Sequence, residues 1–243
     1  KPSPSMAIIT TWTKEDFDKW VIYDEPEWLA INKPAGVPTA PSEHHPQDLS
    51  RWIKTVWSDA ALAHRLDRLA SGILIITKNK KVQRQWAKLF ESDDLRKTYL
   101  ALVFGRTKEQ GMIDIKIDST LAHGKVKLFR GKSAQTQYKL VDYDESRDVS
   151  LVIGRALTGR THQIRAHFGA INHAIIGEHL YRSKTAKPAW ADDLDRPWLH
   201  AYRLEARLGH WGGNKKIDLT APIGDDLMKY LSEKQKSALA KLD

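Results

Sequence analysis

Short apolar runs separated by polar turns recur along the chain and predict strands. Residues 73–76, Ile-Leu-Ile-Ile, follow a Ser-Gly pair and precede a Lys-Asn-Lys turn, so this β-branched run is too short for a helix and predicts a buried strand. Runs at 21–23 and 28–31 flank an Asp-Glu-Pro-Glu segment and predict a β-hairpin. Further strands are expected at 99–104, 150–155 and 199–208.

Apolar residues spaced three or four positions apart predict helices over 49–57 and 81–91. The polar segment 12–19 has room for one or two helical turns. A helix is expected to start within 158–170, and the amphipathic pattern over about 223–241, with Asp near its start, predicts a C-terminal helix.

Between these elements the chain is rich in turn residues and in basic residues. The segment N-K-P-A-G-V-P-T-A-P-S contains too much Pro and Gly for a regular element, and 182–197 is expected to be an exposed loop. Residues 105–133 predict a hairpin with a long basic arm. Its G-K-V-K-L-F-R-G-K stretch lacks the spacing of a Walker phosphate-binding loop.

The expected strands outnumber the expected helices and are mostly joined as hairpins. This pattern predicts an α+β fold, a single catalytic domain built on a largely antiparallel mixed sheet flanked by helices and loops. We expect residues 1–11 to be a disordered lead or a remnant of expression, and 12–243 to form the domain. No internal repeat is visible.

Charge and composition narrow the class of protein. The 243 residues contain 39 Lys and Arg against 30 Asp and Glu, a formal charge of +9 that favours a polyanionic partner such as RNA. Cysteine is absent, which excludes disulfides, thiolate zinc sites and a cysteine nucleophile. No apolar run approaches the ~18 residues that cross a membrane. We therefore expect a cytoplasmic protein, monomeric and independent of membranes.

The candidate chemistry lies just before the strand at 73–76, in the sequence A-H-R-L-D-R-L-A-S-G. Asp67 stands between Arg65 and Arg68, which gives its carboxylate a reason to stay ionised on a loop held by a core strand. An isolated Asp-Arg pair is more often a structural surface ion pair.

Other site classes find less support. His162 and His167 are five residues apart with no acidic residue between them, so they do not match a helical metal-binding pair, and we expect no metal and no cofactor. Double-stranded DNA recognition would need a helix-turn-helix, zinc-finger or leucine-zipper pattern, none of which is visible.

Several motifs together resemble the RluA family of RNA pseudouridine synthases. The loop H-R-L-D-R-L-A-S-G is similar to the family pattern H-R-L-D-x-x-T-S-G, and four companion motifs follow the family order. They are V-I-Y-D-E-P-E-W-L-A-I-N-K-P-A-G from Val21, R-K-T-Y-L-A-L-V from Arg96, T-G-R-T-H-Q-I-R-A-H from Thr158 and P-W-L-H-A from Pro197. The resemblance covers roughly residues 21–222. No S4-type RNA-binding domain, which several relatives carry, is expected in this chain.

The resemblance implies isomerisation of a specific uridine in structured ribosomal or transfer RNA, and it assigns the catalytic residues. Asp67 is the expected catalytic carboxylate, as nucleophile toward the sugar or the base or as the base that takes a sugar proton. Arg165 is expected to keep it ionised, and Tyr99 to pack on the uracil and move the C5 proton. On spacing alone, Tyr99 is a core or edge aromatic.

The remaining assignments concern RNA contact and the pocket wall. Arg65 is expected to enter the base stack when the target nucleotide flips out, although it can equally pair with Asp67 and hold the loop shut. Ile164 and Leu199 are expected to form an apolar wall. The other expected RNA-contacting residues are Arg68, Arg160, His162 and Lys33.

Two alternatives remain open. Ala70 stands where the family usually has Thr, and the lost hydroxyl suggests an RNA-binding pseudoenzyme without turnover. A nucleoside or glycoside hydrolase would ordinarily use two carboxylates, whereas Asp67 has only arginines beside it.

Overall fold

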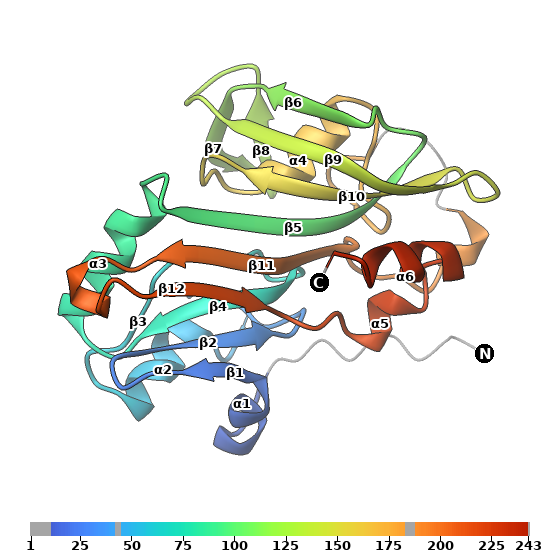
Figure 1. The fold of residues 1–243 in the computed structure, drawn as a ribbon. Coiled ribbons are helices and arrows are strands. Elements are labelled where there is room, and N and C mark those ends of the chain that lie inside the picture. The colour runs from blue at the N-terminus through green and yellow to red at the C-terminus, as the bar shows by residue number, and fades with distance from the viewer. Residues whose placement is uncertain (1–10, 42–44, 183–187, 243) are drawn as a thin grey trace. The chain divides into compact units, whose positions relative to one another are not determined.

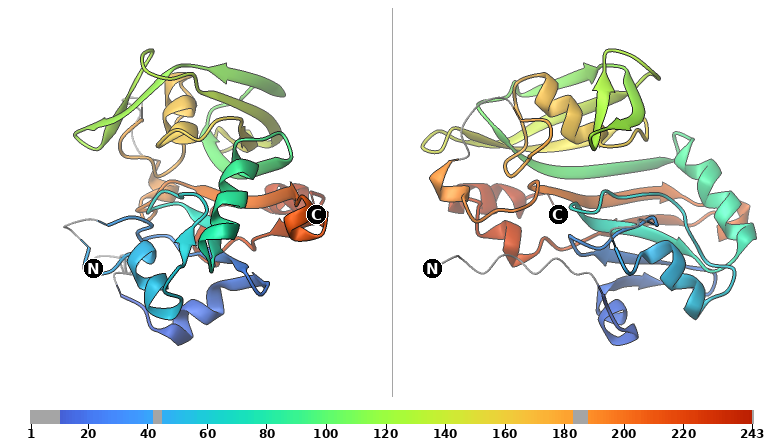
Figure 2. Two further views of the ribbon diagram at one scale, coloured as in Figure 1. Left: turned by 90° about the vertical axis from the view of Figure 1, so that its left-hand side faces the viewer. Right: turned by 180° about the vertical axis from the view of Figure 1, so that it is seen from behind.

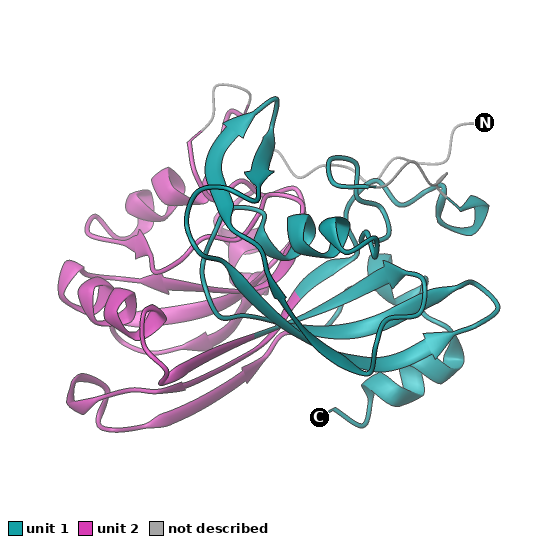
Figure 3. Cartoon of the chain, turned by 90° about the horizontal axis from the view of Figure 1, so that it is seen from above, with its two compact units in different colours: residues 1–5, 98–200, 223–243 teal, residues 6–97, 201–222 magenta. Residues whose placement is uncertain are grey.

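The computed structural model describes residues 11–41, 45–182 and 188–242. These residues form two compact units, one comprising 98–200 and 223–242 and the other 11–97 and 201–222 (Figure 3). The expected lead, residues 1–11, lies outside the described residues except for its last position. The single catalytic domain expected over 12–243 stays a prediction.

The unit that contains the H-R-L-D loop is built on one sheet (Figure 1). Its strands run in the order β1 (Val21–Asp24), β2 (Trp28–Lys33), β4 (Ser71–Thr77), β11 (Leu199–Arg207) and β12 (Lys216–Thr220), and β3 (Ala61–Leu62) also pairs with β4. The predicted hairpin is confirmed as the antiparallel pair β1 and β2. Every residue of β4 is buried, as its apolar run predicts.

Three helices of this unit begin at side-chain caps. They are α1 (Lys14–Trp20), α2 (Leu49–Val56) and α3 (Lys80–Phe90), with N-caps Thr13, Asp48 and Asn79. Each cap oxygen accepts a backbone N–H that the first helical turn would leave unpaired. The apolar face of α3 buries Trp86 among Trp28, Ile73 and Ile75 of β2 and β4. The helices predicted at 49–57 and 81–91 are therefore confirmed.

The other unit contains the antiparallel strands β5 (Leu95–Phe104), β10 (Val149–Ala156), β9 (Gln135–Asp144) and β6 (Gln110–Asp114), in that order. The helix α4 (Gln163–Ala170) packs against β9 and β10. A separate hairpin, β7 (Ile117–Ala122) and β8 (Lys125–Leu128), lies beside α4 (Figure 2) and corresponds to the predicted basic hairpin. The α+β class with a mostly antiparallel sheet is confirmed.

The predicted C-terminal helix over 223–241 is wrong as a single element. The segment holds α5 (Asp225–Met228) and α6 (Glu233–Leu239). Ser232 is extended, with φ −68° and ψ 160°, and forms a capping box with Gln235 that starts the second helix. The remaining helical turns are η1 (Ala189–Ala191) and η2 (His210–Gly212). None of the described helices is long and apolar enough to cross a membrane.

Candidate active site

The loop that carries Asp67 leaves the sheet at a histidine. The N–H of Ala63 donates to the carbonyl of Ile75 at 2.9 Å, as in an ordinary antiparallel ladder. At the next position the ring Nε2 of His64 accepts the N–H of Ile75 at 3.1 Å. Because the ring replaces a main-chain carbonyl, the chain can turn away from β4 after residue 63 and still leave no strand N–H unpaired.

His64 can accept this bond only as a neutral ring with its proton on Nδ1. Burial, together with the charge of Lys97, lowers the pKa of His64 to about 3. The ring also packs on Phe90 of α3, with ring centroids 4.5 Å apart. His64 therefore stays neutral at physiological pH and fixes the start of the loop.

The loop is held further along by bonds to its own carbonyls. The hydroxyl of Thr39 donates to the carbonyl of Leu66 at 3.1 Å. The carbonyl of Arg68 accepts from the N–H of Gly36 at 2.8 Å and from Nζ of Lys33 at 3.2 Å. The Pro- and Gly-rich segment after β2 thus serves as a brace for the H-R-L-D loop.

The expected role of Lys33 in RNA contact is wrong. Its side chain is completely buried, and its ammonium group also donates to the carbonyls of Pro34 at 2.8 Å and Val37 at 3.2 Å. A buried ammonium needs such partners because its desolvation is costly. Lys33 ties two loops together and does not face a phosphate.

The loop ends with two small residues, Ala70 and Gly72, whose structural roles differ. Ala70 is buried, and its N–H donates to the main-chain carbonyl of Asp67 at 3.0 Å, closing a backbone turn over residues 67–70. Gly72 has φ +112°, and a Cβ there would lie 2.2 Å from the carbonyl oxygen of Ala201. Only glycine fits this close approach of β4 to β11.

The three charged residues of the loop differ in exposure. Arg65 is exposed, and its two expected roles, base flipping and pairing with Asp67, stay predictions. Asp67 is half-buried. Arg68 is half-buried, its Nη1 is buried without a hydrogen-bond partner among the described residues, and burial lowers its pKa.

In the other unit, Arg165 of α4 is buried and forms a bidentate pair with Glu178. Nε lies 2.6 Å from Oε2 of Glu178 and Nη2 lies 3.0 Å from Oε1. Burial by itself raises the pKa of Glu178, but the hydrogen bonds and charge of Arg165 hold that pKa below its ordinary value. The pair fixes the plane of the guanidinium group.

Glu178 is a residue that sequence reasoning missed, and so is Tyr181. The guanidinium carbon of Arg165 lies 5.6 Å from the centre of the Tyr181 ring, within cation–π range. Oη of Tyr181 lies 2.8 Å from Nδ1 of His162. The local sequence around Glu178 carries no recognisable motif, so only the fold reveals these contacts.

The turn that leads into α4 is organised by Gln163, where the helix begins. Its buried side chain accepts the N–H of Arg160 at 3.1 Å and the hydroxyl of Thr158 at 2.7 Å. His162 takes a left-handed conformation with φ +53° at the N-cap position. Nε of Arg160 donates to the carbonyl of Ser133 at 3.0 Å.

The remaining predicted residues also lie in this unit. Tyr99 is half-buried on β5, opposite Gly154 of β10. Ile164 and Leu199 are buried, and their role as a pocket wall stays a prediction. The structure thus brings Arg65, Asp67, Arg68 and Lys33 together in one unit. The other unit holds Tyr99, Arg160, His162, Ile164, Arg165 and Leu199, since the boundary between the units falls within β11, after residue 200.

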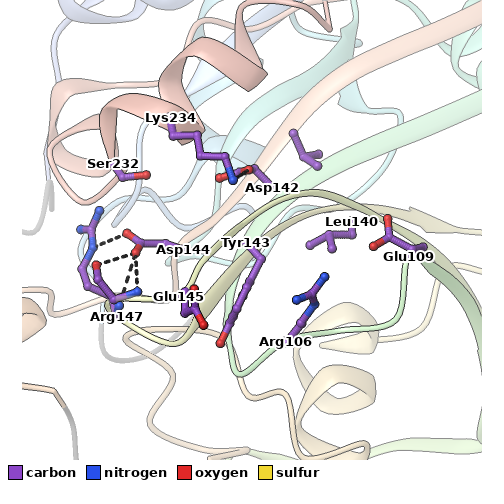
Figure 4. Close-up of a pocket in the computed structure, with 12 residues that line it drawn as sticks. Arg106, Glu109, Leu140, Asp142, Tyr143, Asp144, Glu145, Arg147, Ser232 and Lys234 are labelled. Atoms are coloured by element: carbon purple, nitrogen blue, oxygen red, sulfur yellow. Dashed lines mark hydrogen bonds and ion pairs between the residues drawn. The ribbon is translucent and has the colours of Figure 1, made fainter.

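A metal cluster or a pocket elsewhere in this unit would be an alternative site among the described residues. The described residues contain no group of three or more His, Asp and Glu side chains placed to hold a metal. A pocket of about 660 Å³ lies at the β9–β10 turn and α6, lined by residues such as Arg106, Asp142 and Lys234 (Figure 4). None of the predicted site residues lines it.

Comparisons with known proteins agree with these motifs. Residues 27–170 match the family model described as RNA pseudouridylate synthase. The chain is 30% identical over 190 residues to the dual-specificity RNA pseudouridine synthase RluA of Escherichia coli O6:H1, covering 76% of this chain and 84% of that protein. It is 31% identical over 199 residues to the RluA of Vibrio parahaemolyticus, covering 77% and 78%.

Two solved human structures share the fold. RNA pseudouridylate synthase domain containing 1 is 22% identical, with a TM-score of 0.66 over 92% of this chain and 94% of that chain. RNA pseudouridylate synthase domain containing 4 is 20% identical, with a TM-score of 0.69 over 93% and 95%.

Proposed function

This chain belongs to the RNA pseudouridylate synthase family, and from that premise we propose that it isomerises a specific uridine in structured ribosomal or transfer RNA. The reaction breaks the bond between C1′ of the sugar and N1 of uracil, turns the base and rejoins it through C5. No water is consumed and no electrons are transferred. Two relatives are named dual-specificity enzymes, so we propose that more than one class of RNA be tested as the substrate.

The observation that carries the proposal is the setting of Asp67. Its carboxylate lies on a loop held by His64 and by bonds to the carbonyls of Leu66 and Arg68. A carboxylate fixed in this way can attack the sugar, attack the base or accept a sugar proton. All three roles need the ionised form, so substitution by the neutral amide tests them together.

Tyr99 and Arg165 supply the other catalytic groups of the proposal. The ring of Tyr99 packs on the uracil and its hydroxyl moves the C5 proton. The pair with Glu178 fixes the plane of the Arg165 guanidinium group. The proposal gives this cation the role of keeping the catalytic carboxylate ionised. Ile164 and Leu199 exclude water, which would otherwise divert cleavage into hydrolysis.

Asp67→Asn is expected to abolish pseudouridine formation and leave RNA affinity within a few-fold of the wild type. The substitution removes the reacting carboxylate but none of the carbonyls by which the loop is held. Pseudouridine is measured in unmodified ribosomal and transfer RNA transcripts, with circular dichroism as the control for folding. Turnover above about 1% of wild type would move the catalytic role elsewhere, because loss of an essential group costs roughly 10²-fold or more. Free uracil as the product would instead identify a hydrolase.

Arg65 is assigned to base flipping. It is exposed at the tip of the braced loop, and flipping a nucleotide out of a stack costs a few kcal/mol that a planar cation filling the gap can offset. Arg65→Ala is expected to cripple modification of a uridine in a structured stem or loop. The loss should be much smaller when a neighbouring abasic site already holds the target unstacked. Equal losses on the two substrates would leave base flipping without support.

A further inference from the structure

Phe129 is the most exposed of the large hydrophobic residues that the structure describes, with 76% of its surface accessible. It follows β8 directly and has φ +63°, a left-handed conformation that bulky residues rarely adopt. The strained backbone of Phe129 and the exposure of its apolar ring to solvent both cost stability. Such an outlier points to a function at that position.

The backbone on either side of Phe129 is fixed. Ile117 and Lys132 exchange two hydrogen bonds, of 2.9 and 3.0 Å. Gly131 has φ +87°, and a Cβ there would lie 2.5 Å from the carbonyl oxygen of Ile117. The turn therefore holds its shape through main-chain contacts, and the ring is presented by a rigid support.

Cationic residues lie on both sides of Phe129 in the sequence. The exposed residues of this stretch include Lys125, Lys127, Arg130 and Lys132. Asp118 is an acidic neighbour of two of the four. Nε of Arg130 lies 3.4 Å from its Oδ2, and Lys127 lies opposite it in the hairpin and helps to lower its pKa. An exposed aromatic residue in a segment with this excess of positive charge is typical of a single-stranded nucleic-acid surface, because bases stack on the ring and phosphates contact the cations.

The base of the hairpin is connected to the surroundings of Arg165. Ile117 and Val126 pack in one small core with Ala166 of α4. The N–H of Val126 donates to Oη of Tyr181 at 2.8 Å, and the ring of Tyr181 lies 5.6 Å from the guanidinium carbon of Arg165. RNA held by the hairpin is thereby held at a fixed place relative to the guanidinium group within the same unit.

We propose that the β7–β8 hairpin and the turn after it, residues 117–132, form an RNA-binding surface on which Phe129 stacks against an unpaired base of the substrate. Lys125, Lys127 and Lys132 contact the flanking phosphates. The inference rests on the proposed function for the identity of the RNA. A protein partner fits less well, because the four exposed cations would have to be buried or neutralised in its interface.

The test compares Phe129→Ala with Met112→Ala and Phe129→Tyr in the full chain. Met112 is an apolar residue of the same unit, 48% exposed on β6 near Glu109 and Asp114, and so serves as the matched control. Affinity for an unmodified transfer RNA transcript and for a uridine-rich single strand is measured by filter binding. Phe129→Ala is expected to weaken binding about 5- to 100-fold, the usual worth of one stacked base, while Phe129→Tyr and Met112→Ala stay within about twofold of wild type.

Two additional measurements separate this proposal from its competitors. Lys125→Gln is expected to reduce the slope of log affinity against log salt by about one, as the loss of one phosphate contact requires. Unchanged RNA affinity for Phe129→Ala would overturn the proposal. A lower sedimentation coefficient of this variant than of the wild type would also overturn it, because it would mark the turn as a contact between protein chains. If the wild type binds RNA but forms no pseudouridine, the proposed function fails, and the binding comparison still decides the role of Phe129.

Discussion

At the scale of single residues, the ring of His64 takes the place of a main-chain carbonyl in the sheet. Its ring accepts the N–H of Ile75 at the point where the chain leaves β4, and this requires the neutral form. The H-R-L-D motif predicts chemistry at Asp67, but the role of its first residue depends on a contact eleven positions away. Lys33 shows the same limit, since the sequence gives no sign that this lysine, at the end of β2 and beside a proline, is buried.

The stability of the protein should depend on the protonation of His64. Its pKa is about 3 in the fold against an ordinary value of 6.5, so between these values the unfolded chain binds a proton that the folded chain does not. The free energy of unfolding is therefore expected to fall as pH decreases from 6.5 toward 3. The stability difference between wild type and His64→Gln should shrink by up to about 3 kcal/mol between pH 7 and pH 4. Urea unfolding at a series of pH values measures it, and a constant difference would contradict the assignment.

At the scale of elements, the sequence pattern predicted the helices and strands that depend on interactions between neighbouring residues. The β1–β2 hairpin and the helices α2 and α3 follow from turn residues, caps and apolar spacing. The break between α5 and α6 was missed although the sequence contains its signal, the S-x-x-Q capping box at 232–235. The pairing of Arg165 with Glu178 could not be predicted, because only the tertiary fold brings the helix and the later loop together.

The approach of β4 to β11 gives a prediction at this scale. Gly72→Ala is expected to prevent stable folding, because the new Cβ would lie 2.2 Å from the Ala201 carbonyl oxygen in addition to the cost of φ +112°. Gly124→Ala is the matched control, with φ +75° and nothing within 4 Å of the added Cβ. It should cost only the left-handed penalty of roughly 1–2 kcal/mol. Thermal unfolding compares the two, and equal losses would show that backbone conformation alone matters.

At the scale of the whole molecule, the formal charge of +9 should make the affinity for RNA decrease as ionic strength increases. If about six phosphates are contacted, affinity should fall by ~10³-fold between 50 and 200 mM salt through counterion release. Turnover of RNA already bound should change little, because salt weakens the phosphate contacts that govern binding, and the chemical step follows binding. Binding and single-turnover rates across a salt series check both statements. A flat salt dependence would mean that the basic surplus is not the RNA-binding surface.

After His64, the hydrogen bonds that shape the H-R-L-D loop go to its main chain, so these bonds do not depend on the side chains that follow. Thr39, Gly36 and Lys33 bind carbonyl oxygens, which every amino acid supplies. Residues 65, 67 and 68 can therefore be exchanged without removing the bonds that shape the loop. A library randomised at these three positions would consist mostly of folded proteins, so selection would act on chemistry alone. In evolution the same independence lets new activities be sampled on an unchanged scaffold.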